Sequence, residues 1–276
     1  MLKARILTAL IIAPLALMGL FGLPPREFSG LIMAILAVCG WEWANFCRFE
    51  PIPRVVYGVI IAGCFLAFGD YLLVWLALAA IAWSVAIGLI LRYPRQSEFW
   101  QSSWVLAGVG ILVLLPAGSS LIALKAHALG NQWILVLLVL IWSADIGAYF
   151  IGRRWGRKKL LPEVSPGKSV AGLIGGLVMA MIVGGALVAY LPAVSLQTDW
   201  QFWLAVAASV ALISVVGDLT LSMFKRNRGI KDSSRLLPGH GGFLDRLDSL
   251  FSAAPLFCGW LVIFGLIGCA VNRSRS

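Results

Sequence analysis

The chain is poor in charge, in histidine and in regularly spaced cysteine. Only 12% of its 276 residues are charged, against roughly a quarter in a soluble globular protein, so an ordinary water-soluble fold is excluded. The two histidines, His127 and His240, lie in nothing that resembles H-E-x-x-H, which argues against a zinc enzyme. The five cysteines show no spacing typical of a zinc site or a disulfide framework, and we expect them to be packing residues.

Long apolar runs, in contrast, fill the chain. A transmembrane helix needs about 20 mostly apolar residues, and the runs are continuous, not alternating, which excludes a β-barrel. We therefore expect an all-α, polytopic integral membrane protein with about nine transmembrane helices. The predicted spans are 6–23, 28–47, 55–69, 71–91, 103–124, 132–152, 170–191, 201–224 and 249–270. The first run is longer than a signal-peptide core and lacks a convincing cleavage site, so we expect it to be retained.

Residues 1–130 are expected to form a set of N-terminal transmembrane helices, and residues 131–276 a C-terminal set that carries the catalytic site and its cytoplasmic loops. The obvious intramembrane charge of the first half is Glu42, in "GWEWANF". Because it falls in the last third of its predicted span, we expect its side chain to snorkel towards the interface; a functional role is the alternative.

The distribution of basic residues predicts the orientation. With nine spans and the N-terminus inside, 18 of the 22 Lys and Arg fall on one side of the membrane and four on the other. The positive-inside rule makes the richer side cytoplasmic. The two large polar segments, 153–168 and 225–246, are then both cytoplasmic.

Asp145 is the first candidate for chemistry, in "SADIGAYFIGRRWG". Tyr149 lies four residues later, on the same helical face. A buried carboxylate that stays ionised needs a nearby cation. A helix–helix hydrogen bond is the structural alternative.

The next candidate is "SPGKS", which contains Ser165, Lys168 and Ser169. It is not a P-loop, because Pro162 stands where the first glycine is required. We expect a turn with a lysine and two hydroxyls at the N-terminus of the following helix. Such a terminus binds phosphate through free N–H groups and the helix dipole.

The third candidate runs from Asp218 to Asp248. Asp218, Ser222 and Lys225 are spaced to share one helical face. In "PGHGG", glycines that include Gly241 and Gly242 flank His240 and allow close backbone approach to a ligand. The segment also contains Arg226, Lys231, Asp232, Asp245, Arg246 and Asp248.

Carboxylates without histidine or thiolate partners suit hard cations such as Mg²⁺, which bridge to substrate phosphates. An interfacial basic segment that attracts anionic lipid is the alternative. That alternative explains the lysines and arginines but not the aspartates among them. The mixture favours a site for metal and phosphate.

From Ser222 to Asp248, "SMFKRNRGIKDSSRLLPGHGGFLDRLD" resembles the phosphatidate cytidylyltransferases, also called CDP-diglyceride synthases. The serine, Lys-Arg, Lys-Asp, His-Gly-Gly and Asp-Arg-x-Asp elements of that family are all present. "SADIGAYFIGRRWG" and "SPGKS" are also similar to it, so the resemblance covers about residues 143–270. One departure is Val170-Ala171-Gly172, where many relatives have Trp-Glu-Gly or Trp-Gln-Gly.

The resemblance implies the reaction of CTP with phosphatidic acid to give CDP-diacylglycerol and pyrophosphate, with Mg²⁺ required. By analogy with two-metal sites, a second cation is an option. On that basis we expect Asp218 and Asp245 to hold metal, with Asp248 and Asp145 as the alternatives. The cationic groups that would neutralise phosphates are Lys225, Arg226, Lys231 and Arg246. Ser222, Lys168 and His240 would orient the phosphates. The enzyme would lie in a bacterial-type inner membrane with its site facing the cytoplasm, as a homodimer by family expectation, and with no nucleic-acid partner.

Three other classes fit less well. A CDP-alcohol phosphatidyltransferase pattern starts with Asp-Gly, a dipeptide that this chain lacks. A lipid phosphatase needs an Arg-Pro and paired histidines, which are also missing. A transporter is expected to carry polar groups at mid-membrane in repeat-related helices, and no such pairing is present.

Overall fold

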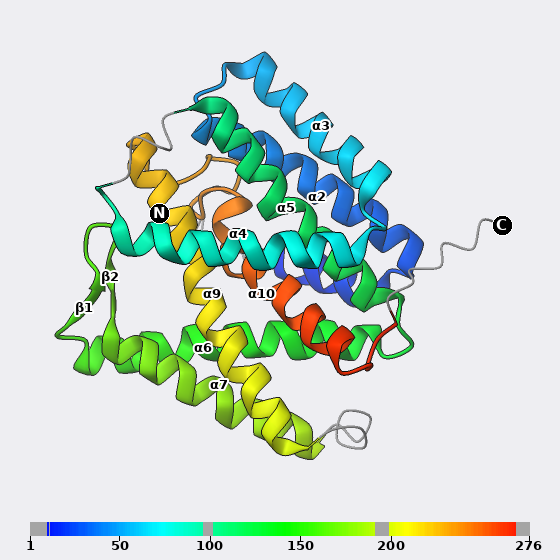
Figure 1. Cartoon of the computed structure of the whole chain (residues 1–276), viewed down its shortest axis with the longest axis vertical. Coiled ribbons are helices and arrows are strands. Elements are labelled where there is room, and N and C mark those ends of the chain that lie inside the picture. Colours follow the sequence, from blue (N-terminus) through cyan, green and yellow to red (C-terminus); the bar gives the residue numbers. More distant parts are fainter. Residues whose placement is uncertain (1–9, 11, 96–101, 191–198, 269–276) are drawn as a thin grey trace.

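The computed structural model describes residue 10 and residues 12–95, 102–190 and 199–268. Helices dominate it, and eight of those described are long and apolar enough to cross a membrane. This confirms the expected all-α, polytopic architecture (Figure 1). The elements are η1 (Met18–Gly22), α2 (Pro25–Phe46), α3 (Pro51–Phe68), α4 (Leu72–Arg92), α5 (Ser103–Ala126), α6 (Gly130–Trp155), β1 (Lys159–Leu161), β2 (Ser165–Ser169), α7 (Val170–Tyr190), α9 (Trp200–Arg228) and α10 (Leu244–Ile263).

The eight long helices correspond to the second to ninth predicted spans. Part of the first predicted span, 6–23, lies outside the described residues, and the described part contains a shorter apolar helix, Ile12–Gly22. The last span begins earlier than predicted, because α10 starts at Leu244 and so includes Asp245 and Asp248. Helix α5 continues through Pro116.

Local sequence explains where these helices begin and end. Helices α2 and α3 start with proline, whose missing N–H costs nothing in the first turn of a helix. Helix α9 ends at Gly229, which has a φ of 73° and whose N–H reaches the carbonyl of Arg226. Glycine adopts this left-handed conformation without strain, so the chain leaves α9 and enters the loop 230–243.

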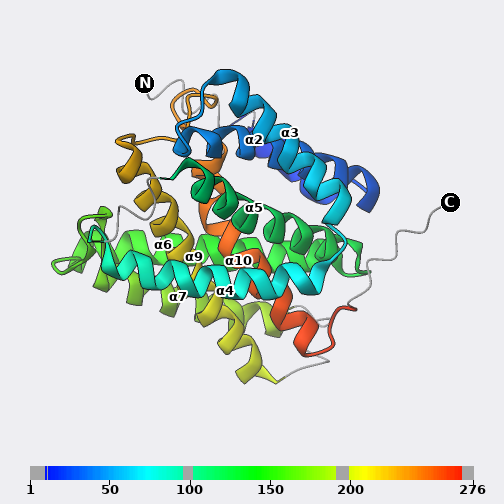
Figure 2. The same cartoon turned by 45° about the horizontal axis from the view of Figure 1, so that its top comes forward.

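Helix α5 lies at the centre of the bundle, in contact with α2, α4 and α10 (Figures 1 and 2). Aromatic rings fix the end of α2 against α9. The ring centroid of Trp43 lies 5.4 Å from that of Phe224 and 5.5 Å from that of Phe46, and both ring pairs are edge-on. The helices of the first half therefore pack directly against those of the second.

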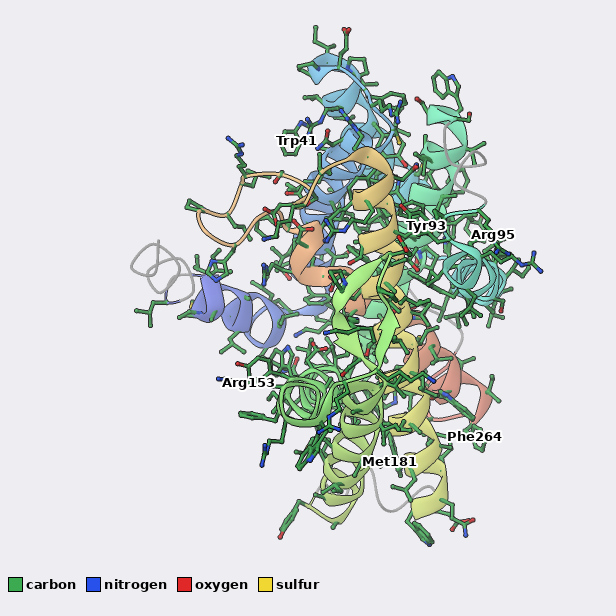
Figure 3. All side chains as sticks on the ribbon, turned by 90° about the vertical axis from the view of Figure 1, so that its left-hand side faces the viewer. Trp41, Tyr93, Arg95, Arg153, Met181 and Phe264 are labelled. Atoms are coloured by element: carbon green, nitrogen blue, oxygen red, sulfur yellow. The ribbon has the colours of Figure 1, made fainter. Side chains whose placement is uncertain are left out.

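The strands β1 and β2 form a small antiparallel hairpin in which Lys159 pairs with Ser169 and Leu161 with Ser165. This corrects the expected turn at 165–169, which is an extended strand; α7 starts at Val170, as predicted. Backbone pairing with β1 stabilises the extended form. Figure 3 looks onto this side of the molecule, where Arg153 and Arg95 lie on either flank of the hairpin.

The hairpin and the loop 230–243 lie at the same end of the bundle, towards the left in Figure 1. The antiparallel pairs α6·α7 and α9·α10 bring this about, since each pair turns over at that end. Arg226 connects the two segments, because its Nε donates to the carbonyl of Val164 at 3.3 Å. The two polar segments predicted to share one side of the membrane lie at the same end of the bundle, and their side of the membrane stays a prediction.

Candidate active site

The core of the site is an ion pair between α9 and α10. Lys225 Nζ lies 2.8 Å from Asp245 Oδ1, and the two side chains are 12% and 6% exposed. Lys225 stands in the last turn of α9 and Asp245 in the first turn of α10. Each charge complements the helix terminus that carries it, which explains in part why the sequence places them there.

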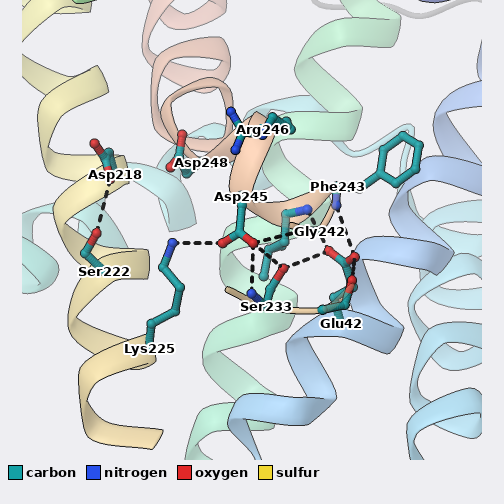
Figure 4. A network of polar contacts seen from close by, with 12 residues as sticks. Glu42, Asp218, Ser222, Lys225, Ser233, Gly242, Phe243, Asp245, Arg246 and Asp248 are labelled. Atoms are coloured by element: carbon teal, nitrogen blue, oxygen red, sulfur yellow. Dashed lines mark hydrogen bonds and ion pairs between the residues drawn. The ribbon is translucent and has the colours of Figure 1, made fainter. Parts of the chain in front are cut away.

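Asp245 also holds the loop 230–243 in place. Its Oδ2 accepts the N–H of Ser233 at 2.8 Å, the hydroxyl of Ser233 at 3.0 Å and the N–H of Gly242 at 3.0 Å (Figure 4). Both oxygens of this carboxylate therefore have protein donors. The metal role expected for Asp245 stays a prediction, and it requires Lys225 to move away from Oδ1.

Local structure explains why glycine stands at positions 241 and 242. Gly241 has a φ of 83°, where a side chain is strained, and a Cβ at Gly242 would lie 2.5 and 2.6 Å from the carboxylate oxygens of Glu42. The expected close approach of backbone therefore occurs, and the group approached within the protein is a carboxylate.

A second ion pair lies beside the first. Lys168 Nζ, on β2, is 2.6 Å from Asp218 Oδ2, and the side chains are 26% and 31% exposed. The Ser222 hydroxyl donates to Asp218 Oδ1 at 3.2 Å, which confirms the predicted shared face. Asp145 and Asp248 interact electrostatically with Asp218 and with Lys168. Lys168 thus contacts Asp218 on α9 and interacts at longer range with Asp145 on α6 and Asp248 on α10; Figure 4 draws Asp218 and Asp248 on the neighbouring helices α9 and α10.

The donor set of this cluster is carboxylate and hydroxyl oxygen, which suits Mg²⁺ and not a soft metal. Among the described residues, no three His, Cys, Asp or Glu side chains are close enough together to hold a metal ion as they stand. The Lys168 ammonium lies against Asp218, where it neutralises part of the negative charge. The residue types suit a hard cation, but binding one requires the carboxylates to come closer together as well as Lys168 to leave Asp218.

Several other predicted residues lie around these pairs. Arg246 donates to the carbonyl of His240 through Nε at 3.0 Å and through a terminal nitrogen at 2.7 Å. The ring Nδ1 of His240 is buried and has no hydrogen-bond partner within the described part of the chain. Lys231 and Asp232 are exposed on the loop.

Three further predicted site residues carry hydroxyl groups: Ser165 and Ser169 on the hairpin and Tyr149 on α6. Ser169 is buried and its Oγ accepts the N–H of Gly172 at 3.1 Å, so it caps α7. Ser165 begins β2. Tyr149 is 57% exposed, and its hydroxyl accepts from Arg153 at 3.1 Å.

Glu42 is the residue that the sequence analysis misjudged. It was expected to snorkel, but its side chain is fully buried and accepts hydrogen bonds from Ser233, Ser234, Phe243 and Leu244. Internal donors in the loop 230–243 and at the start of α10 have replaced water as its partner. The available signal was the placement of an ionisable group within an apolar span.

A separate hollow of about 460 Å³ lies at the opposite end of the bundle, between the start of α2 and the start of α6. Its cation, Lys125, donates to Leu20 O and to Asn131 Oδ1, both at 2.6 Å. These contacts tie the N-terminal segment to α5 and α6, so the lysine has a structural explanation.

The described residues form an apolar helical bundle, typical of a membrane protein, with lysine–aspartate pairs at one end. The comparisons place this bundle in a family of transferases. A model described as "Cytidylyltransferase family" matches residues 3–264, and the chain belongs to the phosphatidate cytidylyltransferases within it. The phosphatidate cytidylyltransferase of Pseudomonas aeruginosa is 45% identical over 95% of this chain and 97% of the relative. That of Haemophilus influenzae is 38% identical over 93% and 97%. A Staphylococcus aureus relative of the same name is 31% identical over 92% and 97%.

Proposed function

We propose that this protein transfers CMP from CTP to phosphatidic acid, giving CDP-diacylglycerol and pyrophosphate. The observation that carries the proposal is the pair of adjacent ion pairs, Lys168–Asp218 and Lys225–Asp245, at one end of an apolar bundle. Two polyanionic substrates require cations that can be released to them, and a lipid substrate requires a site next to the bilayer. The names of the relatives support the same reaction.

In this reaction a phosphate oxygen of phosphatidic acid attacks the α-phosphorus of CTP. A new P–O bond forms, the bond from the α-phosphorus to the oxygen bridging to the β-phosphorus breaks, and pyrophosphate leaves with the electron pair. The nucleophile is largely ionised at neutral pH, so no strong base is needed. Catalysis then depends on positioning and on charge stabilisation.

Lys225 and Lys168 are the groups best placed to take up the developing charge. Each is held by an aspartate before substrate arrives, and each can turn its ammonium from a carboxylate to a phosphate. Arg226 and Arg246 contact backbone carbonyls at the hairpin and the loop, where further phosphate oxygens can be met. Lys231 supplies an exposed cation on the loop.

Mg²⁺ dependence is part of the proposal. Asp218 and Asp248 would hold the ion, with Asp145 beside them and with Asp245 joining once Lys225 has turned to substrate. When bound, the ion supplies neutralisation of the converging phosphates. The release of Lys168 from Asp218 to the nucleotide leaves the carboxylates free for it.

We place the protein in the bacterial inner membrane with this end facing the cytoplasm. The positive-inside distribution supports this orientation, as does the chemistry of the substrates, because CTP is cytoplasmic whereas phosphatidic acid is anchored in the leaflet. A homodimer is proposed only from the family resemblance, and chemical cross-linking in membranes measures it.

The test is an assay of the purified protein in detergent with radiolabelled CTP and phosphatidic acid, with Mg²⁺ or with EDTA. We expect CDP-diacylglycerol only with Mg²⁺, and at least a hundredfold lower rate for Asp218→Asn and Asp248→Asn. The matched control is Asp199→Asn, because Asp199 is exposed at the opposite end of α9 and makes no side-chain cap. Wild-type rates in both site variants would refute the proposed metal ligands, and a folded wild type without product would refute the function.

A further inference from the structure

The contacts of Glu42 join the first half of the chain to the catalytic loop. Glu42 Oε1 accepts the hydroxyl of Ser234 at 2.5 Å and the N–H of Phe243 at 3.0 Å. Its Oε2 accepts the N–H of Leu244 at 2.7 Å and the hydroxyl of Ser233 at 3.1 Å (Figure 4). All four donors lie about 190 to 200 residues further along the sequence.

The burial of this carboxylate calls for such a set of donors. A carboxyl group removed from water costs several kcal/mol unless hydrogen bonds replace its solvation, and Glu42 has no exposed surface. Two of the donors are N–H groups at the start of α10, where the helix dipole favours negative charge. The contacts are therefore strongly directional, and they determine where α10 begins.

The same donors position the neighbouring catalytic pair. The Ser233 hydroxyl lies 3.1 Å from Glu42 Oε2 and 3.0 Å from Asp245 Oδ2. One hydroxyl carries one hydrogen, so it donates to one carboxylate at a time, while backbone N–H groups hold both carboxylates in place. A shift of Glu42 is thereby transmitted to Asp245 and, through it, to Lys225.

A second contact from α2 supports the same segment. Asn45, three residues after Glu42, donates through its Nδ2 to the carbonyl of Ser233 at 3.0 Å. Arg228, at the end of α9, donates to the carbonyl of Asn45 at 3.0 Å. The backbone of the loop 230–243 is thus held by α2 at Ser233. The two ends of this loop are already fixed by α9 and α10.

We propose that Glu42 is a positioning residue for cytidylyl transfer: without contacting substrate, it fixes segment 233–244, and through it Asp245, so that Lys225 is held where it can meet the reacting phosphates. This inference rests on the proposed function. It assigns a role in the reaction to α2, a helix of the first half.

The test compares Glu42→Gln with Glu27→Gln in the full-length protein, purified in detergent. The control changes the same residue type in the same helix, at an exposed first-turn position. In Glu42→Gln, the amide NH₂ faces N–H donors in place of a carboxylate oxygen. We expect kcat to fall at least tenfold, with the KM values for CTP and phosphatidic acid within about twofold of wild type, because only transition-state positioning is lost. Glu27→Gln should match wild type.

A double-mutant cycle separates positioning from loss of folding. Ser234→Ala removes one donor to Glu42 and leaves the contacts of Asp245 intact, so its kcat should fall about three- to tenfold while the protein stays folded at the assay temperature. Added to Glu42→Gln, it should lower kcat less than twofold further, because the shared contact is already gone. If Glu42→Gln does not fold, Ser234→Ala alone tests the positioning role. A lower kcat with KM values near those of wild type supports that role.

The outcomes are distinct for the two proposals. An active wild type with Glu42→Gln or Ser234→Ala at wild-type kcat overturns the positioning role alone, and so do fully additive effects. A folded wild type that releases no pyrophosphate from CTP and phosphatidic acid overturns the function, and the positioning role falls with it.

Discussion

Two lysine–aspartate pairs at the site differ in how readily they can open. The side chains of Lys225 and Asp245 are nearly buried, whereas those of Lys168 and Asp218 retain about a quarter and a third of their exposure. Ion pairs open to water contribute little to stability, so little is lost when Lys168 leaves Asp218. The exposed pair therefore suits substrate capture, and the buried pair suits alignment.

Replacing Lys168 tests this difference. We expect Lys168→Gln to raise the KM for CTP at least tenfold, because the exchangeable cation is gone, while the unfolding temperature stays within about 2 °C. Lys158→Gln is the control, since Lys158 is exposed at the hairpin and makes no ion pair among the described residues. Steady-state kinetics with varied CTP give the answer, and an unchanged KM in Lys168→Gln would contradict the capture role.

A single methyl group at Gly242 should abolish activity. In Gly242→Ala, the new Cβ would meet the Glu42 carboxylate and the Ser233 hydroxyl. Both residues are fully buried, so their side chains have little room to move aside. We expect at least a hundredfold loss of rate. Gly259→Ala, in α10, meets nothing within 4 Å and should retain wild-type rate. Comparable rates for the two variants would show that the loop relaxes around the extra atom.

At the residue scale, most of the site could be predicted because polar side chains stand out in an apolar sequence. Asp218, Ser222 and Lys225 follow helical spacing, and the first two do share a contact. Glu42 could not be judged in this way, because two of its partners are backbone N–H groups about 200 residues away. Every residue except proline has a backbone donor, so the sequence carries no mark of which donors a carboxylate will meet.

At the scale of elements, the helices were predictable and the hairpin was not. Continuous apolar runs predict helices in lipid, because a helix satisfies its own backbone. Strands β1 and β2 have only three and five residues, too few for an alternating pattern to be visible. The pairing that makes Ser165–Ser169 extended comes from a partner strand, so it is a tertiary effect.

The junction between β2 and α7 offers a stability test. Ser169→Ala removes the side chain that accepts the Gly172 N–H and should cost about 1 kcal/mol, as N-cap losses do. Ser84→Ala is the control, because its hydroxyl contacts only the Ala80 carbonyl on the exposed face of α4. Thermal unfolding in detergent should show a lower midpoint for Ser169→Ala alone, and equal midpoints would contradict the cap.

At the scale of the whole molecule, the described helices pack as one bundle. The hairpin and the loop 230–243 make one end of this bundle polar. Helices α3 and α4 expose many large apolar side chains, including Val59, Leu66 and Ile81, as helices in contact with lipid do. The charged hairpin and loop both lie at the end where α6 and α9 finish. The orientation of that end in the membrane is a prediction open to direct measurement.

Single cysteines measure this orientation. A membrane-impermeant maleimide applied to intact cells should label Arg26→Cys, at the start of α2, but not Lys158→Cys or Lys231→Cys, which should react only in inverted vesicles. The unsubstituted chain is the control: Cys39, Cys47 and Cys258 are buried, and Cys64, which is partly exposed, lies within α3. Labelling of Lys158→Cys and Lys231→Cys from opposite sides would contradict a shared cytoplasmic face.

The long separation between Glu42 and its donors also affects biosynthesis. Ribosomes add about 5 to 20 residues per second, and Leu244 is 202 positions later. A newly inserted second helix therefore waits roughly 10 to 40 s with an unsatisfied acid group before its partner emerges. During this interval the nascent protein depends on the insertion machinery, or on protonation of the Glu42 carboxylate, to keep that helix in the bilayer.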